Sequence, residues 1–242
     1  MKPNFLFVAW PYVALALFCF GIAGRYLLSR KQMAAVEAEL TDAWAVFGGS
    51  KLCRVSLLLL LLGHLAGLIF PHGILLWNGS TIRLYLLEGF AFTVGVVAFV
   101  SWAALMWRHL ERSSDSAAAE FADTVFLALL FVGLLSGLLM AAFYRWGSSW
   151  GAMTLTPYAV SLLRANPTAG FVMQMPFLVR LHIFSWFAAV AVLPLTRLAA
   201  FIVLALHRCF GLMGRPVIAV GRAAEAWMQR HDPAARIWPE ED

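Results

Sequence analysis

The stretch from Leu57 to Phe70 reads LLLLLLGHLAGLIF, in which His64 stands among leucines, glycines and other apolar residues. With the residues before it, from Lys51, it forms an apolar run of about twenty residues, the length that crosses a ~30 Å hydrocarbon core as a helix. The apolar residues are continuous rather than alternating, which favours a helix over a strand of a membrane barrel. This stretch therefore predicts a transmembrane helix with an ionisable side chain inside it.

The rest of the sequence has the same character. Of its 242 residues, 62% are hydrophobic and 13% are charged, whereas a soluble domain is about half apolar and about a quarter charged. We predict an all-α membrane protein in which residues 1–206 form a bundle of five transmembrane helices and residues 207–242 form a tail. The predicted spans are 6–29, 51–70, 84–107, 121–144 and 178–206.

The positions of lysine and arginine predict how these helices are oriented. Cytoplasmic loops carry an excess of both residues, and here the first loop, the third loop and the tail are the basic segments. We therefore expect the N-terminus outside and the C-terminus in the cytoplasm. Because the basic residues lie beside helix ends, the net charge of +5 indicates membrane orientation and not nucleic-acid binding.

The three cysteines argue against two kinds of redox centre. Cys19, Cys53 and Cys209 form neither a CxxC nor a CxxCH motif. Covalent c-type haem and a cysteine-ligated metal or iron–sulfur cluster within this chain are therefore not expected.

Two histidines, His64 and His182, are expected inside the apolar spans. His64 comes about six residues before the outer end of its helix and His182 about five after the outer start of its own, so at 1.5 Å per residue both lie roughly 6–10 Å inside the same face. Two imidazoles at equal depth on two helices suit axial ligation of one haem iron. Gly63 and Gly67 thin the helix beside His64, so that a flat macrocycle can lie against it.

Two other interpretations of these histidines are open. A buried histidine commonly forms a hydrogen bond to a neighbouring helix, and a histidine within the membrane can also relay protons in a transporter. Transporters usually carry paired acids near the midplane. Here the predicted spans contain almost no acids, and Glu88 and Asp123 lie near helix ends, which disfavours the transporter.

Several short motifs accompany the two histidines. They are Gly63-His64 with Pro71-His72, Arg180-Leu181-His182, Pro194-Leu195-Thr196-Arg197-Leu198, and Trp146-Gly-Ser-Ser-Trp-Gly with Thr156-Pro-Tyr. With these motifs, five spans and an outer N-terminus, the sequence resembles the gamma subunit of respiratory nitrate reductase, the membrane cytochrome b that oxidises quinol. The resemblance covers most of the chain.

The resemblance implies a haem count. The family holds two b haems whose four histidine ligands lie on the second and fifth helices, and His64 and His182 match the outer pair. The inner pair aligns with Arg54 and Ala200. We therefore expect one non-covalent haem b on the outer side, and no second haem.

Other histidines and arginines complete the predicted sites. His109 and His207, at cytoplasmic helix ends, are expected to be solvated and not a displaced inner haem site. The remaining site residues implied by the resemblance are Arg180 and Arg145 for the haem propionates, and His72 and Arg83 for quinol. Simpler roles are open for each of these four, as interface anchors, as a helix-end cap or as a snorkelling side chain.

The predicted function is that of a haem b membrane subunit of a multi-subunit respiratory oxidoreductase in the cytoplasmic membrane of a prokaryote. It would pass electrons between the quinone pool and partner redox subunits, with the substrate chemistry on those partners. Because an inward route lacks its second haem, the partners are either iron–sulfur and catalytic subunits or a periplasmic c-type cytochrome. The tail, with Pro216 and Arg222, resembles the family's docking arm. The alternative is a haem-free or vestigial membrane anchor for a redox complex.

Overall fold

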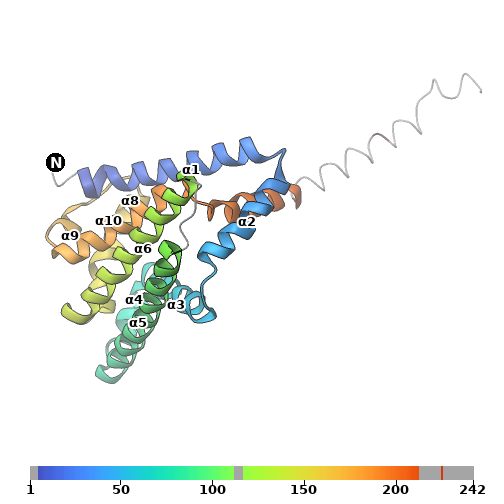
Figure 1. Ribbon diagram of the computed structural model, residues 1–242. Coiled ribbons are helices and arrows are strands. Elements are labelled where there is room, and N and C mark those ends of the chain that lie inside the picture. Colours follow the sequence, from blue (N-terminus) through green and yellow to red (C-terminus); the bar gives the residue numbers. More distant parts are fainter. Residues whose placement is uncertain (1–4, 112–116, 213–224, 226–242) are drawn as a thin grey trace, which may run out of the picture.

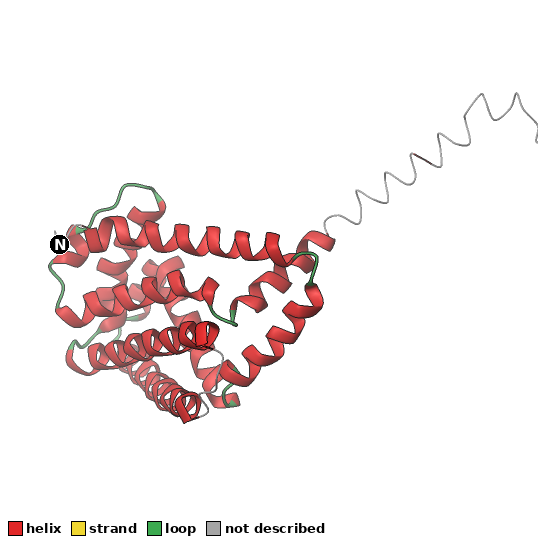
Figure 2. Ribbon diagram, turned by 45° about the horizontal axis from the view of Figure 1, so that its top comes forward, coloured by secondary structure: helices red, strands yellow, loops and turns green. Residues whose placement is uncertain are grey.

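A computed structural model describes residues 5–111, 117–212 and 225, which are mostly helical (Figures 1 and 2). Within these residues no strand occurs. Five helices are long and apolar enough to cross a membrane: Phe5–Ser29, Lys51–Ile69, Thr81–Glu111, Glu120–Phe143 and Phe177–Leu195. The prediction of an all-α membrane protein with five transmembrane helices is confirmed, while the orientation of the termini stays a prediction.

The described residues form five long helices and several shorter ones. The long ones are α1 (Trp10–Ser29, preceded by η1, Phe5–Ala9), α3 (Lys51–Ile69), α5 (Thr81–Glu111), α6 (Ala117–Phe143) and α10 (Phe177–Val192). The short ones are α2 (Met33–Phe47), α4 (Pro71–Trp77), α7 (Gly147–Trp150), η2 (Gly151–Leu155), α8 (Thr156–Leu163), α9 (Gly170–Met173) and η3 (Leu193–Leu195). A final apolar helix covers Ala199–Leu212.

The long helices pack side by side in the order α3, α5, α6, α10 and α1. The main core lies between α5 and α6, where Trp102 and Leu105 meet Phe126 and Leu127. The indole of Trp102 is buried and donates a hydrogen bond to the Leu127 carbonyl at 3.0 Å, so its polar atom is satisfied. Helix α3 is the edge of this row, and in the described part of the chain it has no packing against α10 comparable to these contacts.

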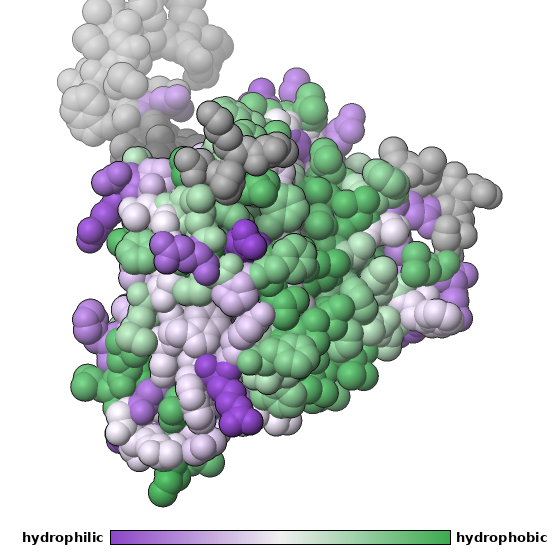
Figure 3. Space-filling model, turned by 90° about the vertical axis from the view of Figure 1, so that its left-hand side faces the viewer, coloured by the Kyte–Doolittle hydropathy of each residue, from purple (hydrophilic) through white to green (hydrophobic). Residues whose placement is uncertain are grey.

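The outer surface of the bundle is apolar. Leucines on α3 such as Leu58, Leu61 and Leu62 are exposed, as are Phe20 on α1 and Phe90 on α5. Figure 3, seen from the left-hand side of Figure 1, shows a broad continuous apolar flank. Such a surface is stable against lipid and not against water.

The prediction for the second half of the fifth span is wrong. The sequence predicts one kinked helix over 178–206, but α10 ends at Val192, η3 adds one turn, and Thr196 is extended (φ −87°, ψ 160°) before the final helix begins at Ala199. Pro194 lacks the N–H that would continue the helix. Distant polar side chains bind the backbone groups that the break sets free, as described below, and this stabilises a full break in place of a kink.

Two further segments complete the comparison with the sequence. Helix α2 lies in the first predicted loop and was not expected; its Val36 packs with Ala200 and Val203 of the final helix. The motif Thr156-Pro-Tyr begins helix α8, whose Tyr158 is buried and packs with Phe7. The tail features Pro216 and Arg222 lie outside the described residues.

Candidate functional site

The two predicted histidines face one another. His64 lies five residues before the end of α3 and His182 five residues after the start of α10, so their depths match. Their ring centres are 6.1 Å apart and the ring planes differ by 21°. These two side chains meet across the space between two helices that are not packed together.

Each imidazole is oriented by a backbone carbonyl. His64 Nδ1 lies 2.7 Å from the Leu60 carbonyl oxygen, and His182 Nδ1 lies 2.9 Å from the Gly133 carbonyl oxygen. A carbonyl oxygen only accepts hydrogen bonds, so Nδ1 carries the proton in both rings. In the neutral form the lone pair is then on Nε2, which is the arrangement in which a histidine binds a metal.

Glycines lie beside the histidine pair on α6 and on α3, and the space around them differs between the two helices. A Cβ built on Gly137 of α6 would lie 3.0 Å from His182 Cε1, so a side chain at this position would crowd the ring. A Cβ on Gly63 or Gly67 would meet nothing within 4 Å, so α3 borders open space beside His64. Gly137 was not predicted as a site residue, although Gly133 and Gly137 form a GxxxG spacing that indicates close approach of membrane helices.

The two predicted propionate partners differ in their surroundings. Arg180 lies less than one turn before His182, and its Nε is buried without a hydrogen-bond partner among the described residues. Arg145 is exposed next to Trp146, which has a positive φ of 67°. Arg180 is therefore the more suitable of the two for binding an anionic group within the bundle, because an unpaired polar atom there is costly.

His72 and Arg83, the predicted quinol residues, lie at the same end of the bundle as His64. His72 is exposed and is the second residue of α4. The Arg83 guanidinium lies 5.5 Å from the centre of the Trp77 ring and donates to the Leu76 carbonyl at 3.3 Å. Arg83 thus joins α5 to the end of α4, which supports its anchoring role at least as directly as contact with a quinol.

The other end of the bundle has no matching histidine pair in the described residues. Arg54 lies over the Trp44 ring at 5.2 Å and donates to the carbonyl oxygens of Gly48 and Gly49. Ala200 is fully buried. His109 Nε2 is 2.9 Å from Thr124 Oγ1, and the His207 ring packs 6.4 Å from Tyr26.

The described part of the chain holds no group of three or more His, Cys, Asp or Glu side chains that could bind a metal ion. The cysteines are all free thiols. Two imidazoles alone are insufficient for a tetrahedral zinc site, but they suffice for the two axial positions of a macrocycle-bound iron.

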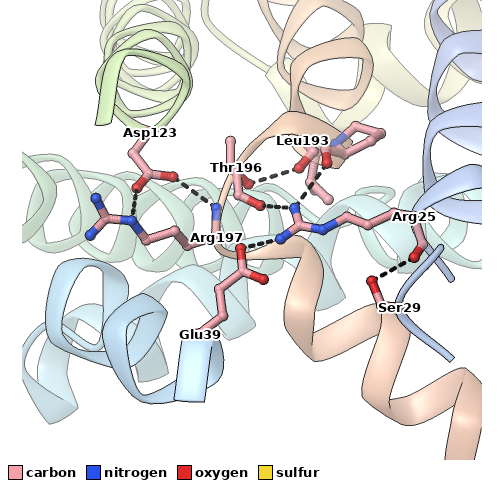
Figure 4. A network of polar contacts seen from close by, with 8 residues as sticks. Arg25, Ser29, Glu39, Asp123, Leu193, Thr196 and Arg197 are labelled. Atoms are coloured by element: carbon pink, nitrogen blue, oxygen red, sulfur yellow. Dashed lines mark hydrogen bonds and ion pairs between the residues drawn. The ribbon is translucent and has the colours of Figure 1, made fainter. Parts of the chain in front are cut away.

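A polar network occupies the break after α10 (Figure 4). Arg25 donates to the carbonyl oxygens of Pro194 (3.0 Å) and Thr196 (2.6 Å) and forms an ion pair with Glu39 of α2. The Asp123 carboxylate is fully buried; it accepts a bond from the Arg197 backbone N–H at 3.0 Å and pairs with the Arg197 side chain at 3.2 Å. The network satisfies the backbone groups that the helix break exposes.

The fold and this site define a class of protein: a multi-pass helical membrane protein with two facing histidines on separate transmembrane helices. The chain belongs to the nitrate reductase gamma subunit family, whose family model matches residues 3–221. The resemblance noted from the motifs is thereby confirmed, and transmembrane and oxidoreductase-associated character follow from it.

Individual relatives agree with this family. The chain is 25% identical over 202 residues to the respiratory nitrate reductase 2 gamma chain of Escherichia coli (strain K12), covering 80% of this chain and 87% of the relative. It is 26% identical over 203 residues to the nitrate reductase gamma chain of Bacillus subtilis (strain 168), covering 82% and 90%. The respiratory nitrate reductase 1 gamma chain of Escherichia coli (strain K12) is 25% identical over 199 residues, covering 80% and 88%.

Proposed function

We propose that this chain is the haem b membrane subunit of a multi-subunit respiratory oxidoreductase and that it binds one haem between His64 and His182. The observation that carries the proposal is the distance of 6.1 Å between the two ring centres. With metal–nitrogen bonds of ~2 Å, two imidazoles on opposite sides of one ion have ring centres about 6 Å apart. The separation in the chain therefore suits a shared ion.

The surroundings of the pair fit a haem in three further respects. Both rings hold their proton on Nδ1 against a carbonyl oxygen, which leaves Nε2 for the iron. The face of α3 at Gly63 and Gly67 borders open space, where a flat ring can lie. The buried, unpaired Nε of Arg180 would be satisfied by a propionate, and the exposed Arg145 is the second candidate for this role.

A bound haem supplies one-electron redox chemistry at this point of the membrane. The residues of the chain then hold the iron, orient the imidazoles and exclude water from one side through α6. We propose that quinol is oxidised beside the site to quinone, with release of two electrons and two protons. His72 accepts one proton at its imidazole, the second proton leaves to the water at the outer face, and Arg83 holds a quinol oxygen. The two electrons would leave one at a time through the haem. Electrons pass to partner subunits, either iron–sulfur and catalytic subunits or a periplasmic c-type cytochrome. Location in the cytoplasmic membrane of a prokaryote, with the N-terminus outside, belongs to the same proposal.

A haem-free membrane anchor is the second candidate. It is favoured by the opposite end of the bundle, where the positions that align with the family's inner ligands carry an arginine, Arg54, and a buried alanine, Ala200. A chain that has lost one cofactor site is open to losing the other.

The two candidates are separated by the haem-to-protein ratio of the purified full-length chain, measured by pyridine haemochrome. We expect a ratio near one in the wild type, near zero in His64→Ala and in His182→Ala, and near one in the matched control His109→Ala. A haem-to-protein ratio near zero in the folded wild type excludes the haem subunit and supports the haem-free membrane anchor. A ratio near two that falls in His109→Ala means that the inner end binds a second haem through other ligands.

A further inference from the structure

A polar cavity lies at the end of the bundle far from the histidine pair. It has a volume of about 410 Å³ and is bordered by the end of α2, the turn before α3, the end of α5, the start of α6 and the break after α10. Trp44, Arg108, His109 and Arg197 are among its lining residues. A volume of this size is typical of a small-molecule site.

An apolar space adjoins this cavity. It measures about 270 Å³ and is lined by Leu40, Thr41, Trp44 and Phe201, from α2 and the final helix. Trp44 borders both spaces, and its ring lies 5.9 Å from that of Phe201. The two spaces together therefore offer a polar compartment beside an apolar one, which suits an amphipathic ligand.

Arg108 supplies an exposed guanidinium to the polar cavity. Arg197 is neutralised by Asp123, His109 contacts Thr124, and Glu120 on the lining has an interaction partner of its own. Arg108 is exposed, and no hydrogen bond or ion pair joins it to another described residue. One guanidinium thus remains available, and its planar donor fork binds phosphate oxygens in pairs.

The depth of Arg108 places it near the lipid headgroups. Helix α5 has 31 residues, a length of about 46 Å at 1.5 Å per residue, and it therefore extends beyond a hydrocarbon core of ~30 Å. Arg108 lies three residues before the end of α5 at Glu111. Basic pockets between membrane helices at this level bind the headgroups of anionic lipids.

We propose that this cavity binds an anionic phospholipid, with the headgroup phosphate on Arg108 in the polar compartment and an acyl chain along Trp44 in the apolar one. A quinone also has a polar head and an apolar tail, but its neutral head would form no ion pair with Arg108. The lipid fastens α2 and the final helix to the bundle, because both elements border the apolar compartment. This site is independent of the proposed haem.

The test compares two lipids with the same acyl chains, phosphatidylglycerol and phosphatidylcholine, on the full-length chain purified in detergent. Binding is measured by native mass spectrometry and by the shift in the thermal unfolding midpoint. We expect phosphatidylglycerol to bind at least about tenfold more tightly than phosphatidylcholine, and Arg108→Gln to remove about tenfold of that affinity. Arg108→Lys, which keeps the charge but loses the fork, should recover only part of it.

Arg30→Gln is the matched control, because Arg30 is an exposed arginine at the end of α1 that does not line either compartment. It should leave the preference for phosphatidylglycerol unchanged. Equal binding of both lipids, or equal losses in Arg108→Gln and Arg30→Gln, overturns the proposal in favour of unspecific surface attraction. The lipid assignment is overturned if inorganic phosphate at the same concentration stabilises the chain as much as phosphatidylglycerol does. It is also overturned if the purified chain retains a quinone or a second haem in this cavity in place of lipid.

Discussion

Replacing Gly137 by alanine would place a methyl carbon 3.0 Å from His182 Cε1 and 3.3 Å from its Nδ1. Non-bonded carbon atoms attract one another best at about 3.5–4.0 Å, so the ring would have to move away by a few tenths of an ångström. It cannot move freely, because its Nδ1 is held 2.9 Å from the Gly133 carbonyl oxygen. The substitution therefore acts on the position of one imidazole with respect to the other.

The size of the effect follows from this crowding. Overpacking by one methyl group typically costs about 1–3 kcal/mol. If His182 has to hold an iron, that strain falls on the bound state, and haem affinity should drop by about 5- to 160-fold. The readouts are the haem-to-protein ratio and the reduced-minus-oxidised b-type spectrum of the purified chain under limiting haem.

The control is Gly95→Ala, which makes the same change on α5, where the added methyl meets Leu138 Cδ1 at 3.8 Å, an ordinary contact. Haem content should be unchanged in this variant. Full haem content and an unaltered spectrum in Gly137→Ala would refute the assignment of His182 as a ligand held in this position. A loss in both variants would point to general destabilisation.

Three further substitutions test the fold. Gly21→Ala should lower the free energy of unfolding by about 1–3 kcal/mol, and with it the thermal midpoint, because the new Cβ would lie 2.6 Å from Pro194 Cβ. The control Gly24→Ala lies on the same helix, and its Cβ would meet nothing within 4 Å, so the midpoint should not change. Asp123→Ala should lower the free energy of unfolding by about 1–3 kcal/mol. This is less than the ~3–5 kcal/mol lost when a fully buried ion pair is broken, because the side chain of its partner Arg197 is 21% exposed. An unchanged thermal unfolding midpoint would contradict this prediction. Burial raises the pKa of the Tyr158 phenol above its ordinary value of 10.0, so the unfolded chain loses this proton first and stability should fall as the pH rises above about 10. Tyr158→Phe should reduce that fall, as followed by thermal unfolding at a series of pH values.

The histidine pair could be predicted because it depends on local quantities. The length of each apolar run fixes where a span begins and ends, and the rise per residue converts sequence position into depth. His64 and His182 come out at matching depth by that arithmetic and lie at matching depth in the structure. What sequence position does not contain is the neighbour on a third helix, so the contact of Gly137 with His182 was missed.

The break after α10 could be predicted only in part, for the same reason. Pro194 indicates a disturbance of the helix from its own chemistry. Whether that becomes a kink or a break depends on partners for the freed carbonyl and N–H groups, and these are Arg25 and Asp123, 169 and 74 residues away from their hydrogen-bonding partners in sequence. Helix α2 supplies Glu39 to the same network, and its mixed composition shows no long apolar run.

The position of α3 at the edge of the row of helices affects how readily the protein is degraded in the cell. Only 11% of the apolar stretch of α3 is buried within the protein, against 33% for α6, and its main packing partner among the long helices is α5. Elements of this kind open locally at low free energy, and such opening admits proteases. A ligand bound between α3 and α10 would join these two helices and oppose the local opening of α3. The amount of that ligand present during synthesis would then determine what fraction of the protein escapes proteolysis.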